Sequence, residues 1–333
     1  MVGVLRQTEA RGARTAACAE DPALRLPTTI RVLERGWLSS NNVVMTGPED
    51  TVLVDSGYVA HAPQTLALVE HALFDQNLGE RTLDRLVNTH CHSDHMGGNA
   101  ALQRRYRCHT SVPIGEAPLI ERWDEDALLL AYADQRAERF RVDANIAAGD
   151  RLRMGGIDWV AIAAPGHDTH ALMFHSPRER ILISGDALWE DGFGVLFPQL
   201  SGREGTFAAT RRTLDSIAAL DVRLVIPGHG EPFEDVDAAL ERAYSRLHAF
   251  EEDPARLARH AARVMLTFAL LEKQRLRIAS LPDYVERTGI LRDINRRFLA
   301  LTPQHFAEWL VRELERARAI KREGDYLVPL ISP

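Results

Sequence analysis

The sequence predicts a layered α/β fold followed by a mainly helical C-terminal segment. Between residues 28 and 250, short β-branched runs alternate with segments whose apolar residues recur at helical spacing, a pattern typical of helices packed on sheets. The composition changes at residues 251–254, Glu-Glu-Asp-Pro, and the pattern beyond is helical until Gly324. A chain of 333 residues is long enough for about two domains with buried cores.

The strands are expected where β-branched and aliphatic residues cluster between turn residues such as Gly47-Pro48 and Ser56-Gly57. These runs are 29–33, 42–45, 51–55, 83–89, 158–162, 181–184 and 224–226. A helix through Leu66, Val69 and Leu73 should separate the third run from the fourth, and another should begin near Gly98.

Two segments depart from this alternation. Residues 1–27 show no clean period, which predicts a loose N-terminal lead-in. Residues 115–140 carry Trp123, Leu128 and Tyr132 as apolar members of a largely helical insertion.

The composition is that of an ordinary globular protein, with 45% hydrophobic and 26% charged residues. No apolar run approaches the roughly 20 residues that cross a bilayer, and Arg6 and Arg11 precede any sustained apolar stretch, which disfavours a secretory signal. Cys18, Cys91 and Cys108 are too few and too scattered for a disulfide framework. We therefore expect a cytoplasmic protein with no membrane partner.

The charge is unevenly distributed. From Pro254 onward the chain has 15 basic and 9 acidic residues, a net of +6, whereas the remainder has 25 basic and 38 acidic residues, a net of −13. A mildly basic tail favours a solvated surface, and contact with nucleic acid is the alternative interpretation.

The strongest chemical pattern is His90-Cys91-His92-Ser93-Asp94-His95, directly after a predicted strand. Residues i and i+2 of an extended segment point the same way, so His90 and His92 can approach one ion together. Asp94 and His95 follow as the chain turns and can face a neighbouring ion. Cys91 should point away from the ligands and pack in the interior.

This segment resembles the His-x-His-x-Asp-His motif of the metallo-β-lactamase superfamily. Each of four further motifs lies at or just after the end of a predicted strand. The motifs occur along the chain in the order that the family shows. These are Leu53-Val54-Asp55-Ser56-Gly57, Pro165-Gly166-His167, Ser184-Gly185-Asp186 and Pro227-Gly228-His229-Gly230. The resemblance spans residues 28 to 250 and implies an αββα sandwich with two divalent metals at the loop ends of two facing sheets.

The resemblance also implies a role for each residue of these motifs. His90, His92 and His167 would hold the first metal, Asp94, His95 and His229 the second, and Asp186 would bridge both. Asp94 and Asp55 count as catalytic residues, with Asp55 accepting a hydrogen bond from a ligand histidine or from loop backbone. Nitrogen and oxygen ligands suit zinc in the first place, and also iron or manganese.

One departure from the family lies after the third histidine, where many relatives read Thr-x-Gly and this chain reads Asp168-Thr169-His170. The extra carboxylate could orient His167 or alter the charge near the metals. His170 is a rival ligand, but the Pro-Gly turn before His167 favours the latter.

The implied reaction is attack of a metal-bridging hydroxide on an activated acyl bond, a thioester or lactone, as in glyoxalase II-like relatives. The substrate would be a small acyl compound, contacted by Trp189, Phe193 and Phe197 after the bridging aspartate. One alternative is a phosphodiesterase or endoribonuclease whose C-terminal part binds RNA. A one-iron sulfur oxygenase is a further alternative, disfavoured because all second-site ligands are present.

The expected domains are therefore a catalytic domain at 28–250, with the 115–140 insertion over the site, and a C-terminal domain at 254–333. In the latter, helices are expected at 254–277, 282–287 and 291–299, then one capped by Thr302, before a hairpin turning at Gly324. This order is similar to the winged-helix appendage of some β-lactamase-like hydrolases. The alternative is a helical cap that packs on the catalytic domain or on the second chain of a homodimer.

Overall fold

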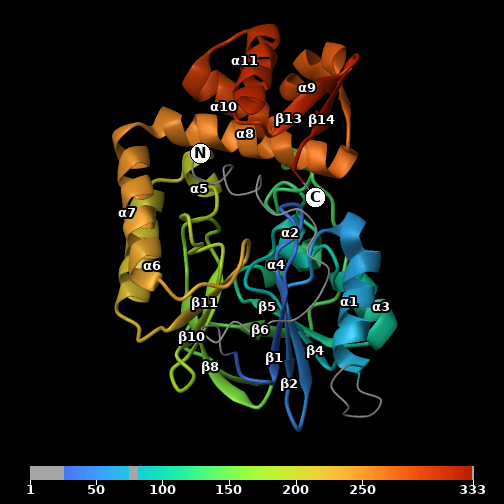
Figure 1. Ribbon diagram of the computed structural model, residues 1–333, viewed down its shortest axis with the longest axis vertical. Coiled ribbons are helices and arrows are strands. Elements are labelled where there is room, and N and C mark those ends of the chain that lie inside the picture. The colour runs from blue at the N-terminus through green and yellow to red at the C-terminus, as the bar shows by residue number, and fades with distance from the viewer. Residues whose placement is uncertain (1–25, 75–81, 332–333) are drawn as a thin grey trace. The chain divides into compact units, whose positions relative to one another are not determined.

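A computed structural model describes residues 26–74 and 82–331 (Figure 1). By their internal contacts these residues form two compact units, which meet in sequence between Glu252 and Asp253. The N-terminal lead-in expected at residues 1–27 lies almost wholly outside the described residues. Within the described ranges, no helix combines the length and the apolar character that a bilayer span requires.

The first unit begins with a six-stranded sheet in the order β1-β2-β3-β4-β5-β6. Its strands are β1 (Ile30–Leu33), β2 (Asn42–Thr46), β3 (Thr51–Val54), β4 (Arg85–Val87), β5 (His109–Pro113) and β6 (Ala144–Ile146). The first three strands pair antiparallel, whereas β3, β4, β5 and β6 run parallel. Parallel strands end at the same edge, so the loops after β3 and β4 emerge side by side.

A second sheet of five strands has the order β11-β10-β9-β8-β7. Its strands are β7 (Arg151–Met154), β8 (Ile157–Ala163), β9 (Leu172–Ser176), β10 (Ile181–Gly185) and β11 (Leu224–Pro227). β10 and β11 are parallel, and the other neighbours are antiparallel.

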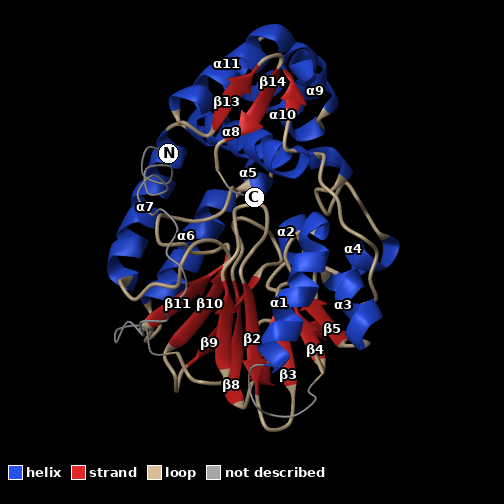
Figure 2. Cartoon of the chain, turned by 45° about the vertical axis from the view of Figure 1, so that its right-hand side comes forward, coloured by secondary structure: helices blue, strands red, loops and turns tan. Residues whose placement is uncertain are grey.

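The two sheets face each other across the main core. Met45 and Val54 from the first sheet belong to the same buried cluster as Trp159 and Phe174 from the second. The outer face of the first sheet is covered by α1 (Ala62–Phe74) and α3 (Asn99–Tyr106). On the other side, α6 (Thr206–Ala218) and α7 (Val236–Glu252) lie beside β10 and β11 (Figure 2). The predicted αββα sandwich is thus confirmed.

The segment 115–140 is less helical than predicted. It contains one short helix, α4 (Ala117–Arg122), and the 3₁₀ turn η3 (Ala131–Ala133), and is otherwise irregular. Trp123, Leu129 and Asp134 have left-handed backbone angles, which interrupt a right-handed helix. The remaining short elements of this unit are η2 (Val59–His61), α2 (Ser93–Met96) and α5 (Phe197–Leu200).

The second unit is mainly helical, as predicted. Its elements are α8 (Pro254–Lys273), β12 (Leu276–Arg277), η4 (Ile278–Ser280), α9 (Leu281–Arg287), α10 (Gly289–Ile294), the π-helical η5 (Asn295–Leu299), α11 (Pro303–Arg316), β13 (Ile320–Glu323) and β14 (Tyr326–Pro329). The Thr302 side chain caps α11, and the hairpin turns at Gly324, both as expected. The first helix ends four residues earlier than predicted, because Gln274 is left-handed and the chain then pairs with β14.

Candidate metal centre

The candidate ligands lie in segments that follow strands of the first unit, in loops except for Asp94 and His95, which belong to the short helix α2. His90 comes after β4, His167 after β8, Asp186 directly after β10 and His229 after β11. The backbone N–H of Gly228 donates to the carbonyl of Gly185, which ties the last two loops together. These loops gather at one end of the facing sheets (Figure 2).

Three histidines form a first cluster. The ring nitrogens of His90, His92 and His167 lie within 4.8 Å of one another, and all three residues are buried. His92 Nδ1 is 2.7 Å from His167 Nε2. Among the described residues, His90 Nε2 has no hydrogen-bond partner although it is enclosed. Converging nitrogens with such an unpaired atom fit a metal ion.

A second cluster adjoins the first. It combines Asp94, His95 and His229, with His229 Nε2 3.1 Å from Asp94 Oδ2. Asp186 lies between the clusters, because its Oδ1 is 3.3 Å from His95 Nε2 and its Oδ2 is 3.2 Å from His167 Nε2. Each carboxylate oxygen thus faces one cluster, as expected of a bridging ligand.

Neighbouring groups fix the orientation of the histidine rings. Asp55 Oδ2 lies 2.8 Å from His95 Nδ1, and the same carboxylate accepts a hydrogen bond from the Thr89 backbone N–H. The carbonyl of Val195 lies 2.7 Å from His167 Nδ1. A hydrogen on each Nδ1 leaves Nε2 free to bind a metal, as is usual for histidine ligands in proteins. The hydrogen bonding predicted for Asp55 is thereby confirmed.

The electrostatics of the centre favour cations. Burial lowers the pKa of His90 well below its ordinary value and, with the rings beside it, that of His92 to about 4, so both are neutral ligands at pH 7. Burial opposes the charge of Asp186, yet the neighbouring imidazoles hold its pKa well below the usual range. For His95, carboxylates led by Asp186 outweigh burial and raise the pKa well above normal. The neutral imidazoles of His90 and His92 and the ionised Asp186 fit divalent ions, whereas His95 would have to give up a proton in order to bind one.

Gly228 makes the close approach of two loops possible. A Cβ atom at this position would lie 2.3 Å from Asp186 Oδ1 and 3.0 Å from His95 Cε1. Any other residue would therefore displace the Asp186 carboxylate.

Cys91 packs in the interior, as predicted. It is 1% exposed and belongs to an apolar cluster with Met96, Val112 and Ile120. Burial raises the pKa of its thiol well above the ordinary value, so it is a poor nucleophile.

Aromatic side chains border the metal centre on two sides. Phe197 lies edge-on to His92 and tilted against His167, with ring centroids 5.5 and 5.4 Å away. Trp189 donates an indole N–H to Asp186 Oδ1 at 3.2 Å and packs edge-on against His229.

Three aromatic residues are expected to contact the substrate, and for Phe193 this prediction is wrong. This residue is 2% exposed and packs against Phe250 in α7, so it contributes to the core. The sequence analysis missed Trp37, whose ring stacks on His229 at 5.6 Å and 6° and meets Trp189 at 5.8 Å. Trp37 precedes no recognisable motif, so no local signal identifies it.

Of the two roles suggested for Asp168, orienting His167 or altering the charge near the metals, the structure favours the second. The Asp168 carboxylate lies beside the candidate ligands, with its Oδ2 3.7 Å from His92 Nε2. His170 is exposed and belongs to none of the three candidate ligand groups found among residues 26–74 and 82–331.

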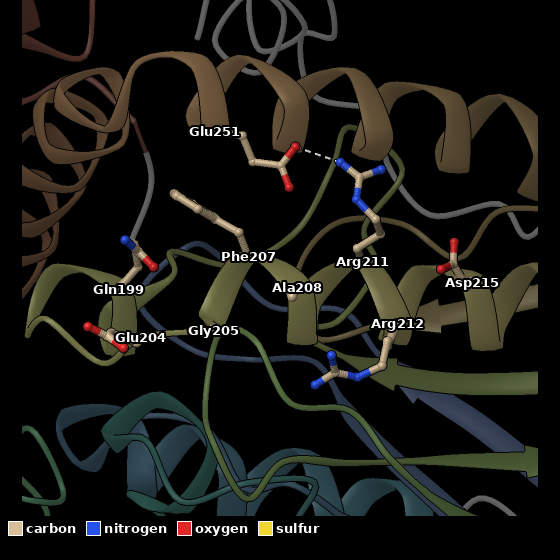
Figure 3. Close-up of a pocket in the computed structure, with 9 residues that line it drawn as sticks. All are labelled: Gln199, Glu204, Gly205, Phe207, Ala208, Arg211, Arg212, Asp215 and Glu251. Carbon is tan, nitrogen blue, oxygen red and sulfur yellow. Dashed lines mark hydrogen bonds and ion pairs between the residues drawn. The ribbon is translucent and has the colours of Figure 1, made fainter.

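A separate surface cavity of about 650 Å³ lies along α6 and the end of α7 (Figure 3). It is lined by Phe207, Arg212 and Asp215, among others, and is crossed by an ion pair between Arg211 and Glu251 at 2.6 Å. The candidate ligands are not among its lining residues.

Comparison with known proteins places this centre in a family. Residues 35–229 match the sequence profile of the Metallo-beta-lactamase superfamily. A hydroxyacylglutathione hydrolase of Hyphomonas neptunium (strain ATCC 15444) is 28% identical over 171 residues, which are 49% of this chain and 57% of that protein. Another from Rhodopseudomonas palustris (strain BisA53) is 28% identical over 193 residues, 55% of this chain and 66% of that protein. The chain spans less than two thirds of the length of these relatives.

Solved structures show the same fold. A metallo-beta-lactamase family protein from Thermus thermophilus has a TM-score of 0.52 and 21% identity, covering 90% of this chain and 98% of that one. A subclass B3 metallo-beta-lactamase of Bradyrhizobium japonicum has a TM-score of 0.53 and 18% identity, covering 70% and 94%. Because the family profile matches more than half of its residues, the chain belongs to the metallo-beta-lactamase superfamily of hydrolases.

Proposed function

We propose that this protein hydrolyses activated acyl bonds, thioesters above all, at a centre of two divalent metals. The observation that carries the proposal is the shared carboxylate, since Asp186 faces both the cluster at His167 and the cluster at His95. Zinc is the metal that we expect first, because imidazole and carboxylate ligands suit it.

Two divalent ions bound here would lower the pKa of a shared water to near neutrality and polarise the carbonyl of the substrate. The protein residues supply the geometry for this chemistry. Asp55 holds the His95 ring, and the Val195 carbonyl holds the His167 ring, so neither has to reorganise during the reaction. No nucleophile from the chain is needed, which agrees with the burial of Cys91.

The substrate class is inferred from the surroundings of the metals. Trp37, Trp189 and Phe197 border the centre and favour an organic ligand with an apolar part. The relatives named above are hydroxyacylglutathione hydrolases, and hydroxyacylglutathione is a thioester. The net charge of −13 before Pro254 opposes the docking of a polyanion, which depends on basic surface.

We also propose that residues 28–250 contain the complete catalytic centre and that residues 254–333 form an appended domain without metal ligands. Support comes from the candidate ligand groups of the described residues, all of which lie between His90 and His229. A chain ending near Phe250 would therefore keep its metals.

The proposed function is tested by offering acyl thioesters, lactones and a single-stranded RNA to protein of known metal content, at low and moderate salt. We expect thioester turnover that His90→Ala abolishes, with lactones second and RNA untouched. RNA cleavage that weakens steeply with salt and requires residues beyond 254 would instead support the phosphodiesterase alternative.

Replacing Trp37 should separate substrate binding from chemistry. We expect Trp37→Ala to raise KM for an aryl thioester by about tenfold, because a stacking surface is lost, with a smaller effect on kcat. Trp37→Phe keeps a ring beside His229 and should remain close to wild type. An unchanged KM in Trp37→Ala with full metal content would show that this ring does not contact the substrate.

A further inference from the structure

Asn41 is a buried amide near the metal centre that the chemistry above does not use. It is 3% exposed and is the last residue of the loop between β1 and β2. Its Nδ2 donates to the carbonyls of Pro227 and Gly230 at 3.0 and 2.7 Å. Its Oδ1 accepts the backbone N–H of Arg35 at 3.0 Å. Both N–H groups of the amide and its oxygen therefore have partners.

The contacts of Asn41 converge on the turn that carries His229. Pro227 and Gly230 stand at the two ends of this turn, and the carbonyl of Gly228 between them accepts the backbone N–H of Asn41 at 2.7 Å. Pro227 and Gly228 are buried, so loss of these hydrogen bonds would leave enclosed carbonyls unpaired. One residue of a distant loop thus holds the turn in a single conformation.

The same loop, residues 34–41, also contacts another ligand of the second cluster. The backbone N–H of Ser40 donates to the carbonyl of Asp94 at 3.0 Å, and the ring of Trp37 stacks on His229. Asp94 comes from the segment after β4 in the first sheet, whereas His229 comes from the loop after β11 in the second. The loop therefore connects two candidate ligands that arise from different sheets.

The first cluster has other supports. The His167 ring is held by the carbonyl of Val195 at 2.7 Å. Within the part of the chain that the structure describes, no hydrogen bond joins residues 34–41 to His90, His92 or His167. A change at Asn41 should consequently reach the second cluster and spare the first.

We propose that Asn41 is a positioning residue of the second cluster: its amide fixes the turn 227–230 and so holds His229 Nε2 opposite Asp94 Oδ2, 3.1 Å away. The proposal rests on the metal centre inferred above and is independent of the substrate. It predicts a defect that is confined to one of two bound ions.

The test measures zinc affinity by competition with a chromophoric chelator. Asn41→Leu has a side chain of similar size that carries no charge and donates no hydrogen bond. We expect one of the two zinc equivalents to bind about 10–100-fold more weakly, the usual effect of losing a partner behind a ligand, while the other stays near wild type. Asn145→Leu, at an exposed asparagine of β6, is the matched control and should change neither equivalent.

A double-mutant cycle with His229→Ala separates positioning from general destabilisation. If Asn41 acts through the His229 turn, Asn41→Leu should cause no further loss of zinc affinity once the imidazole has been removed. Thermal unfolding of the metal-free variants shows whether each of them folds. If Asn41→Leu does not fold, Asn41→Ala replaces it in both backgrounds, and the same selective loss is expected.

Wild-type affinity for both zinc equivalents in a folded Asn41→Leu or Asn41→Ala would overturn the positioning role. Equal weakening of both equivalents, or an equal loss with and without His229→Ala, would overturn it as well, since Asn41 would then support the fold as a whole. Failure of the wild type to bind zinc, cobalt, iron or manganese would reject the metal centre itself. Absence of thioester turnover in a metal-loaded wild type would reject only the proposed substrate.

Discussion

Asp186→Ala should reduce the metal content from about two equivalents per chain to less than one. This residue faces both clusters, and its removal leaves the imidazoles of His95 and His167 without the carboxylate that lies between them. We expect hydrolysis to fall by at least about a hundredfold, the upper end of the loss that outer partners alone cause. Elemental analysis and turnover of the same preparation measure both effects.

The matched control is Asp158→Ala, since the Asp158 side chain is 82% exposed on β8 and pairs only with a surface arginine in the described structure. It should keep both metals and full activity. An Asp186→Ala protein that retains two metals would show that the bridge has been assigned to the wrong residue.

Phe174→Ala should cause the largest loss of stability. Phe174 is 0% exposed in β9 and belongs to the core between the two sheets. Truncation of a buried phenylalanine costs about 3–5 kcal/mol of unfolding free energy, because apolar contacts are lost and a cavity remains. Phe74→Ala is the control, since Phe74 is 85% exposed and its truncation should change stability by no more than about 0.5 kcal/mol.

Fluorescence can restrict this measurement to the unit that contains both residues. Of the five tryptophans, only Trp309 lies beyond residue 252. In a Trp309→Phe background, urea unfolding followed by fluorescence therefore reports residues 26–252 alone. Equal midpoints for Phe174→Ala and Phe74→Ala would contradict the core described here.

The sequence predicts the sandwich and the grouping of the candidate ligands well because both are encoded locally. The candidate ligands come after strands with evident β-branched residues, and His167, Asp186 and His229 each directly follow a glycine. Strand alternation alone also predicts the inward direction of Cys91, which the structure confirms.

The surroundings of the metals depend on contacts between distant segments, which a local pattern does not reveal. Trp37 lies near the start of the first unit's sequence and His229 near its end, yet their rings stack. Phe193 lies in a glycine-rich loop, and such loops often form the mobile side of a substrate site. Its ring instead packs against Phe250 in the core. In the segment 115–140, apolar spacing suggests a helix, whereas positive φ angles at Trp123 and Leu129 break it.

The candidate ligands also join parts of the chain that are far apart in sequence. Asp94 and His229 are separated by 135 positions, yet their side chains lie 3.1 Å apart. A bound ion would therefore act as a reversible cross-link that closes most of the first unit into one loop. Each tenfold rise of free metal above its Kd would add about 1.4 kcal/mol to the stability of the folded state. Resistance to proteolysis, and with it the lifetime of the protein, would then follow the metal supply of its surroundings.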